Sequence, residues 1–348
     1  WYDIESNKIL SSDAETTFYF DRDYIIEARL ISSDTPQFDV GQKRFYDLGE
    51  AANYAESSTE KTIVLVGDGV LKGQYVIPKD VTLLIPFDEA GTLDTTKPAY
   101  TTTAETPKVY RTLTMASGSS ITVNGAISVG GKHFTSSGQE CCKPTGAYGL
   151  IKMQEGSSIT LNNDANLYAW GYITGDGNIT ANSGASVYEY FQVTDWRGGS
   201  QTGDMVNNKQ KVFPFSQYYV QNIEASLTLN AGANEYTYIS VTASFVGTKS
   251  ATIPFVGENG LFNLGTNGRF TKKYIPTKDR MVFTVSGEAS LNSIALSVAG
   301  ISVDSKDYVL PINNNVDIII ESGVTTINKD AALLPGVTVS IAKDAELK

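Results

Sequence analysis

The sequence is poor in the residues that build metal centres, disulfide frameworks and histidine-dependent active sites. Its 348 residues include two cysteines, adjacent at Cys141 and Cys142, and one histidine, His133. Neighbouring Cα atoms lie about 3.8 Å apart, below the usual disulfide range, so a strained vicinal disulfide and two free thiols both stay open. A multi-histidine metal site is excluded, and a zinc site formed by His133 and the two cysteines would lack a fourth ligand. We expect no metal, no cofactor and no Ser-His-Asp triad.

Long apolar runs and an excess of basic residues are also missing. No hydrophobic stretch approaches the roughly 20 residues that span a bilayer, which argues against membrane insertion. The 27 basic residues against 38 acidic ones give a net charge of −11. Nucleic acids and anionic membranes are bound through a positive surface, so both are disfavoured as partners. The chain starts at Trp1 without an initiator methionine or signal peptide, and we expect it to be a piece of a longer protein.

What the chain does contain is a repeated phrase. Residues 118–124 read Gly-Ser-Ser-Ile-Thr-Val-Asn, and residues 156–162 read Gly-Ser-Ser-Ile-Thr-Leu-Asn, 156 − 118 = 38 residues later. A looser copy begins at Gly177, 177 − 156 = 21 residues further on. Turns and short β-branched strands that recur at about 20 residues, or twice that, are typical of stacked-coil solenoids. The repeat predicts an all-β fold, a right-handed parallel β-helix, in which these copies lie one above another.

The regions around the repeat complete the predicted domain. One helix is expected at residues 47–56, with Asp47 as N-cap and an apolar face that caps the first coil. Alternating patterns at residues 227–229, 235–244, 252–256, 262–264 and 281–285 predict antiparallel hairpins. We therefore predict a single elongated domain with four parts: N-terminal strands and cap (1–60), β-helix coils (61–199), a β-hairpin-rich insertion (200–300) and closing coils (301–348).

Aromatic residues form the sharpest local feature. Tyr168, Trp170 and Tyr172 alternate with small or aliphatic residues, so they share one face of a strand. Tyr188 and Tyr190 share a face in the same way, and 190 − 170 = 20 residues is one coil, so Trp170 is predicted to stack on Tyr190. An outward aromatic ladder suits sugar rings or a protein hot spot. The alternative is that aromatic residues within 211–300 cover this face.

The motif Asp-Trp-Arg-Gly-Gly at residues 195–199 adds Trp196 and Arg197 to the candidate site. Its Asp195, with Asp176 or Asp204, offers carboxylates for an enzyme, but glycoside hydrolysis needs two of them at a defined separation. Asp residues in solenoids more often bond their own backbone in turns. The neighbouring lysines at 272 and 273 are interpreted as a solvated hairpin edge.

Several segments resemble a β-helical module of large cell-wall-anchored surface proteins of gut Firmicutes, including Lachnospiraceae. They are residues 75–78, 83–88, 168–177 and 215–224 together with the repeated phrase, and the resemblance extends from about Thr62 to the end of the chain. It implies a secreted protein that is anchored to a Gram-positive cell surface and serves adhesion or host interaction. Some such proteins bind immunoglobulin variable regions in a superantigen-like manner. The resemblance carries over no catalytic residue.

The favoured hypothesis is therefore a non-enzymatic adhesin module that binds a host protein, immunoglobulin being one candidate, or a glycan. Its predicted binding residues are Tyr168, Trp170, Tyr172, Tyr188, Tyr190, Trp196 and Arg197. A carbohydrate-active β-helix enzyme, a polysaccharide lyase or hydrolase, is the first alternative, and a passive structural stalk is the second. Paired carboxylates in an open groove would favour the enzyme, whereas an exposed aromatic patch without them would favour binding.

Overall fold

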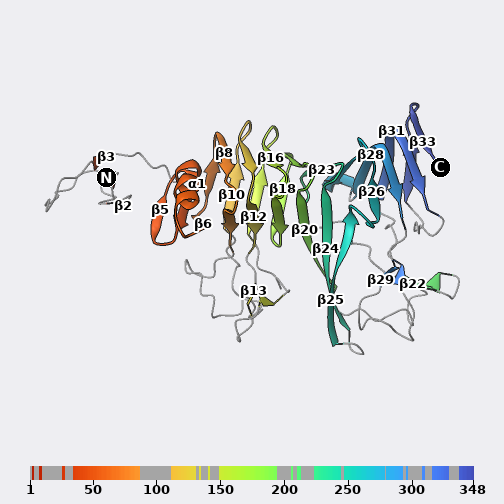
Figure 1. Cartoon of the computed structure of the whole chain (residues 1–348), viewed down its shortest axis with the longest axis horizontal. Coiled ribbons are helices and arrows are strands. Elements are labelled where there is room, and N and C mark those ends of the chain that lie inside the picture. The colour runs from red at the N-terminus through yellow and green to blue at the C-terminus, as the bar shows by residue number, and fades with distance from the viewer. Residues whose placement is uncertain are drawn as a thin grey trace.

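The computed structural model describes, with side chains, residues 34–86, 111–130, 149–189, 223–237, 254–278, 280–292, 316–328 and 337–348. Backbone alone is described for further strand pieces within residues 2–27, 133–141, 190–212, 238–253 and 295–309. The described chain is mostly β, with a large mixed sheet and one α-helix, α1 (Leu48–Ser57). In Figure 1 the strands of the large sheet stand side by side along the long axis, from β5 beside α1 to β33.

Most strands before residue 243 form three columns of parallel strands. Column one contains β7 (Gly69–Leu71), β10 (Thr112–Met115), β15 (Leu150–Met153) and β18 (Tyr172–Gly175). Column two contains β8 (Gln74–Ile77), β11 (Ser120–Val123), β16 (Ser158–Leu161), β19 (Asn178–Ala181) and β23 (Ser226–Asn230). Column three contains β6 (Thr62–Gly67), β9 (Thr82–Ile85), β12 (Ala126–Val129), β17 (Asn166–Ala169), β20 (Ser186–Val193) and β24 (Asn234–Ala243).

The chain visits columns one, two and three in that order, again and again. We use the word pass for each such visit to all three columns, as in residues 150–169 or 172–193. A further pass begins at the bridge between Ile173 and Ile223 and continues through β23 and β24. The parallel set therefore extends beyond residue 199, where the sequence analysis places the end of the coils, because residues 194–222 separate two passes instead of ending the series.

The copies of the repeated phrase lie one above another, as the sequence predicts. Ile121 pairs with Ile159, and Ile159 pairs with Ile179, each in parallel register. All three side chains are completely buried. Because every second residue of a strand faces the same side, this register places isoleucine on isoleucine and gives a continuous aliphatic interior.

The asparagine at the end of each phrase joins the passes at a turn. Asn162 Nδ2 donates to Asn124 Oδ1 at 2.8 Å, Asn182 Nδ2 to Asn162 Oδ1 at 3.4 Å, and Asn230 Nδ2 to Asn182 Oδ1 at 3.0 Å. Asn230 belongs to no copy of the phrase, yet it continues the same ladder. The side-chain amides therefore repeat, at the ends of the strands of column two, the pairing that the backbone makes within them.

The N-terminal end of the described stack is covered by α1. Its side chains Leu48, Ala51, Ala52 and Ala55 are buried, and the Asp47 side chain accepts a hydrogen bond from the Glu50 backbone N–H at 3.0 Å. The predicted helix and its N-cap are confirmed. Two antiparallel strands, β4 (Gln37–Val40) and β5 (Lys43–Phe45), precede the helix, and β4 also pairs with β6.

Antiparallel pairing dominates after the last pass, as the predicted hairpins require. The strands are β25 (Gly247–Val256), β26 (Phe262–Leu264), β27 (Arg269–Ile275) and β28 (Arg280–Leu291), with a short 3-10 helix η1 (Pro276–Lys278) between the last two. β24 pairs with β25, β23 with β27, and β28 with both β26 and β27. Parallel pairing returns when β28 meets β31 (Val316–Ile327), which pairs with β32 (Thr338–Ile341) and β33 (Ala345–Leu347).

The remaining strands are two or three residues long and are described by their backbone. They are β1 (Tyr2–Asp3), β2 (Lys8–Ile9), β3 (Ile26–Glu27), β13 (His133–Phe134), β14 (Glu140–Cys141), β21 (Met205–Val206), β22 (Gln210–Val212), β29 (Ala295–Leu296) and β30 (Tyr308–Val309).

Candidate binding surface

Three tyrosines from successive strands of column three stack on one another. β17, β20 and β24 pair so that Tyr168 lies opposite Tyr188, and Tyr188 lies opposite Tyr236. Their ring centroids are 4.9 Å and 5.1 Å apart, and the ring planes differ by only 15° and 18°. These separations match the spacing of about 4.8 Å between neighbouring strands, so the backbone pairing itself sets the stack. Tyr168, Tyr188 and Tyr236 are called the tyrosine column below.

Two further predicted residues lie beside the tyrosine column. Trp170 follows β17 and stacks on Tyr168, with ring centroids 5.8 Å apart and planes 25° apart. Tyr172 begins β18 of column one and is 39% exposed. Leu167 and Ala169, which alternate with these aromatic residues, are completely buried. The burial therefore alternates as the sequence pattern predicts, with aromatic rings on the outer face.

The predicted stacking of Trp170 on Tyr190 stays a prediction. The parallel pairing of β17 with β20 ends at Ala169 and Glu189, one residue before these two positions. Tyr190 lies opposite Tyr238 in the backbone register of β20 and β24, and its side chain lies outside the described part of the chain. The predicted residues Trp196 and Arg197 lie outside it as well.

The carboxylates considered for catalysis are not assembled in the described part. Asp195 and Asp204 lie outside it, and Asp176 forms an exposed ion pair with Lys273, with Oδ1 and Nζ 3.4 Å apart. Among the described residues there is no group of three or more His, Cys, Asp or Glu side chains that could hold a metal ion. No described helix is long and apolar enough to cross a membrane.

Tyr236, the third member of the tyrosine column, was not predicted from the sequence. It lies 236 − 188 = 48 residues after Tyr188, more than twice the length of one coil. A local signal was present, because Tyr236-Thr237-Tyr238 repeats the alternation of Tyr188-Glu189-Tyr190. Repetition of a short pattern, rather than a fixed spacing, identifies strands that share a column when a long segment separates two passes.

The phenol of Tyr188, in the middle of the tyrosine column, keeps its proton at neutral pH. Burial raises the pKa of the Tyr188 phenol, and the neighbouring Tyr168 and Tyr236 raise it further. The hydroxyl therefore keeps its proton and remains a hydrogen-bond donor. Because Tyr168 and Tyr236 stack on its two faces, they leave the ring edge and hydroxyl of Tyr188 uncovered instead of a flat face.

On the inner side of the same strands lies a buried cluster of three charged residues, Glu189, Glu235 and Lys272, called the buried triad below. Glu189 and Glu235 are completely buried, and Lys272 is 2% exposed. Lys272 Nζ donates to Glu189 Oε1 at 2.5 Å and also to Glu235 Oε1. The prediction that Lys272 lies on a solvated hairpin edge is therefore wrong. It holds only for Lys273, whose side chain alternates to the outer face and is 37% exposed.

Burial and the neighbouring groups shift the pKa values of Glu189 and Lys272. Burial raises the pKa of Glu189 to about 8, although the nearby Lys272 opposes this shift, and Glu235 adds to it. Burial lowers the pKa of Lys272, but Glu189 and Glu235 outweigh burial and leave it raised. At neutral pH Glu189 is therefore mostly protonated and Lys272 carries its charge, in a core from which solvent is excluded.

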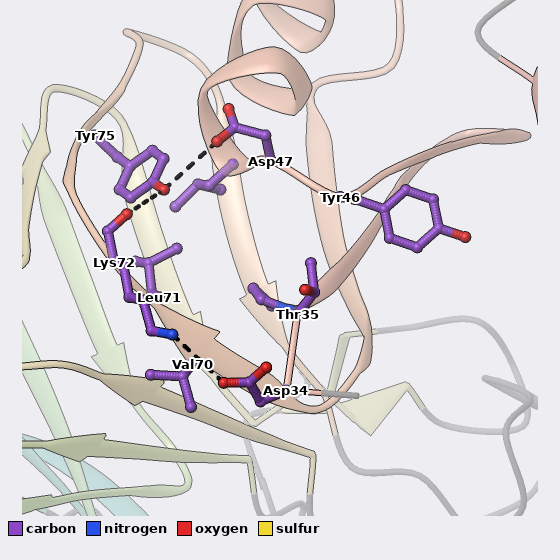
Figure 2. A pocket seen from close by; sticks show the side chains of 10 residues that line it. Asp34, Thr35, Tyr46, Asp47, Val70, Leu71, Lys72 and Tyr75 are labelled. Carbon is purple, nitrogen blue, oxygen red and sulfur yellow. Dashed lines mark hydrogen bonds and ion pairs between the residues drawn. The ribbon is translucent and has the colours of Figure 1, made fainter. Parts of the chain in front are cut away.

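A small cavity of about 170 Å³ lies near the N-terminal helix. Figure 2 shows Tyr75 Oη reaching the Lys72 carbonyl at 2.6 Å and Asp47 Oδ2 at 3.5 Å, while Lys72 Nζ lies 3.5 Å from Asp34 Oδ2. Ligand pockets commonly measure about 300–1,000 Å³, so this cavity is small for a ligand site. Its polar groups tie the start of α1 to β7 and β8.

Comparisons with known proteins leave the surface to be interpreted from its geometry. No protein-family model, no curated protein and no solved structure matches the chain.

Proposed function

We propose that the chain is a right-handed parallel β-helix that serves as a non-enzymatic binding module on a bacterial cell surface. Three columns of parallel strands, visited in the same order in each pass, support the β-helix, because each pass then forms one coil. Crossovers between parallel strands of one sheet are right-handed in about 98% of cases, which supports that hand. In this proposal α1 caps the coils, and the hairpins formed by β24, β25, β27 and β28 are the insertion of a single domain.

The observation that carries the binding proposal is the tyrosine column with Trp170 stacked against it. Aromatic side chains offer a large contact area at a low cost in conformational entropy, and tyrosine is enriched at protein-binding surfaces. Here the rings are held in place by strand pairing and by their mutual contacts at 4.9–5.8 Å. Such a surface loses little freedom when a partner binds, which favours affinity.

The way the rings stack favours a protein partner over a glycan. A sugar ring packs on an open aromatic face, but the faces of Tyr188 are covered by Tyr168 and Tyr236. The three tyrosines are half-buried, and what their stacking leaves uncovered is a row of ring edges and hydroxyl groups at the strand spacing. That row suits a protein surface with alternating apolar atoms and hydrogen-bonding groups. An immunoglobulin is the candidate partner implied by the resemblance to surface proteins of gut Firmicutes.

The enzyme alternative receives less support from the described residues. Glu189 and Lys272 both have raised pKa values, and both lie inside the core, out of reach of a substrate. A catalytic acid or base must lie within hydrogen-bond reach of the group on which it acts. We therefore propose that the module is not an enzyme and that a longer surface protein displays it extracellularly.

A binding screen of the 348-residue protein against immunoglobulins, mucins and a glycan array tests the proposal. We expect saturable binding to a protein. Tyr188→Phe, which keeps the stack and removes one hydroxyl, should weaken it several-fold, since a hydrogen bond is worth about 1 kcal/mol. Tyr236→Ala should weaken it at least tenfold, as expected for a hot-spot residue. Val76→Ala is the control, because Val76 is an exposed apolar side chain, 50% exposed, on β8 of column two.

Each other outcome of the screen has a definite meaning. Binding that both tyrosine variants leave unchanged would overturn the tyrosine column as the binding surface. Binding to glycans alone would mean that the partner is a glycan and not a protein. Turnover of a polysaccharide would favour the enzyme alternative. The absence of any binding would favour the remaining hypothesis, a passive structural stalk.

A further inference from the structure

The two glutamates of the buried triad stand where the preceding pass has aliphatic residues. Glu189 pairs in register with Ala169, and Glu235 pairs with Val187, on the inner face of column three. Ala169 and Val187 are completely buried, and so are both glutamates. Apolar residues therefore fit this part of the interior, and the fold does not require carboxyl groups there.

A third strand brings an amine between the two carboxyl groups. β27 pairs with β23 and β28, which places Lys272 in the core opposite Leu227 and Phe283. Its Nζ lies 2.5 Å from Glu189 Oε1 and is hydrogen-bonded to Glu235 Oε1. The carboxyl carbon of Glu189 is one bond beyond Oε1, so the amine nitrogen already lies in contact with it.

Phenylalanine rings keep water away from the triad. Lys272 Nζ lies 5.5 Å from the centroid of the Phe255 ring. Phe255 contacts Phe262, Phe270 and Phe283 with ring centroids 5.6–5.8 Å apart, and all four rings are at most 2% exposed. An amine and a carboxyl group held in contact in a dry site react with an effective concentration of about 10⁵–10⁸ M, and no solvent competes for the product.

The triad is also incompletely satisfied as a set of ions. Glu189 Oε2 and Glu235 Oε2 are buried and have no hydrogen-bond partner among the described residues. Buried ions are costly unless every polar atom is paired, and apolar replacements are often as stable. A neutral covalent product would remove two charges from the core and keep the contact.

We propose that the protein forms an intramolecular amide bond between Lys272 Nζ and Glu189 Cδ, with Glu235 as the group that moves the protons. Lys272 is the nucleophile, Glu189 supplies the electrophilic carbon, and Glu235 lies within hydrogen-bond reach of the amine.

The reaction balances without a further reactant. The Lys272 ammonium first gives one proton to the Glu235 carboxylate, and the neutral amine attacks Cδ of the protonated Glu189 carboxyl group. Glu235 then gives that proton to the departing hydroxyl, which leaves as water, and takes the second proton from Nζ. One N–C bond forms, one C–O bond breaks, and no atom is oxidised or reduced. Glu235 ends as a carboxylic acid beside the new amide.

The charge states of the triad agree with these roles. A carboxyl group is attacked as the acid and not as the anion, and the raised pKa of Glu189, about 8, keeps it protonated at neutral pH. The raised pKa of Lys272 keeps it an ammonium at rest, so the amine becomes a nucleophile only after a neighbouring base takes its proton. Glu235 is the base in contact with it.

Mass spectrometry of the 348-residue protein tests the proposal directly. We expect a mass lower than the sequence mass by that of one water molecule, and a branched peptide that joins Lys272 to Glu189 after proteolysis. Lys272→Arg, which keeps a buried cation without a nucleophilic amine, should have the full mass, and so should Glu235→Gln. Lys273→Arg, on the outer face of the same strand, is the control and should still lack one water.

The unsubstituted protein decides the question even if the core variants do not fold. A full mass after prolonged incubation at neutral pH would overturn the proposal and leave the triad ionic. A mass loss that persists in Lys272→Arg would place the reaction at other residues and would also overturn it. A branched peptide that joins Lys272 to Glu235 would overturn the assignment of roles.

Discussion

Two neighbouring parts of column three have the same backbone pairing but differ in the side chains on their inner face. In the pass formed by residues 150–169, the inner face of β17 carries Leu167 and Ala169. In the next two passes, the corresponding inner faces of β20 and β24 carry Glu189 and Glu235. The strands pair in the same register in both parts. Strand pairing thus fixes where a side chain lies, while the side chains decide whether the interior is inert or reactive.

The difference between the two parts also shows which residues the fold needs. Stacked aliphatic residues are enough to fill the interior of a pass, as Ile121, Ile159 and Ile179 show. Three ionisable groups in the same interior raise the free energy of the folded state unless their polar atoms are fully paired. Their presence in a fully buried site beside Phe255 points to chemistry rather than to packing.

The largest effect is expected when the triad is broken. Lys272→Ala leaves two buried carboxyl groups without their cation, which costs about 3–5 kcal/mol. It also removes the proposed amide, which closes a loop of 83 residues. By analogy with a disulfide, such a closure stabilises by roughly 4–5 kcal/mol. Unfolding in guanidinium chloride should show a loss of roughly 5 kcal/mol or more.

A matched triple variant separates the two contributions to this loss. Glu189→Ala and Glu235→Val copy the residues of the preceding pass, Ala169 and Val187, and Lys272→Met replaces the amine with an apolar side chain, so that no buried charge is left. This variant should fold and regain the ionic part of the loss, yet unfold at a lower denaturant concentration than the unsubstituted protein. Equal stability of the two proteins would contradict a covalent contribution from the triad.

A second prediction concerns the aliphatic part. Ile159→Ala removes the central side chain of the ladder between Ile121 and Ile179 and leaves a cavity, so we expect a loss of about 3 kcal/mol. Thr160→Ala on the same strand faces outward and should change stability by less than about 0.5 kcal/mol. A loss below about 1 kcal/mol for Ile159→Ala would mean that neighbouring passes move together to fill the space. Thermal unfolding of the two variants measures the difference.

A third prediction uses an ion pair near the surface for comparison with the buried one. Arg280 is bonded to Asp317 across β28 and β31, with Nε and Oδ2 3.0 Å apart, and hydrogen bonds from Arg280 and Thr338 lower the pKa of Asp317. Because the pKa is lowered in the folded state, this stabilisation is present above about pH 3.8, the ordinary value, and is lost as the pH falls below it. Asp317→Asn should cost about 1 kcal/mol at neutral pH.

The pH dependence distinguishes this pair from a general effect of acid. The stabilities of Asp317→Asn and the unsubstituted protein should converge as the pH falls from 5 to about 2, measured by urea unfolding at each pH. Glu346→Gln is the control, because the Glu346–Lys348 pair is 57% exposed on both sides and should contribute almost nothing. A difference between Asp317→Asn and the unsubstituted protein that persists at low pH would contradict the assignment.

The smallest effect on stability is expected in the tyrosine column. Tyr188→Phe keeps the ring between Tyr168 and Tyr236, so the free energy of unfolding should change by less than about 0.5 kcal/mol. The same variant is the one expected to weaken partner binding several-fold. Loss of binding with unchanged stability would locate function on the outer face of the strands whose inner face carries the triad. A large loss of stability would instead make Tyr188 a structural residue.

The sequence predicted those parts of the fold that repeat locally. Ile121 and Ile159 lie in phrases that differ at one position, and their pairing follows from the phrase alone. Asp47 and the spacing of the buried residues of α1 were enough to place the helix. The continuation of the columns through β23 and β24 was not predicted, because residues 194–222 interrupt the spacing.

The triad was beyond sequence reasoning for a different physical reason. Glu189 and Lys272 are 83 residues apart, and they meet only because β27 pairs with β23. Two adjacent lysines resemble a solvated edge, and only the pleat of β27 shows that one of them points inward. The alternation Val187-Tyr188-Glu189 did carry a hint, since it places a carboxylate where the pattern calls for an apolar residue.

The direction of the strands determines how the molecule would respond to being pulled. The strands lie across the long axis (Figure 1), so tension between the two ends loads the contacts from one pass to the next. Under force the passes should detach in sequence, and 20 residues, the offset between the paired Ser158 and Asn178, would release about 70 Å of chain. A bond between residues 189 and 272 would withhold the chain between them from that extension. The module would then lengthen in steps up to that bond and resist stretching there.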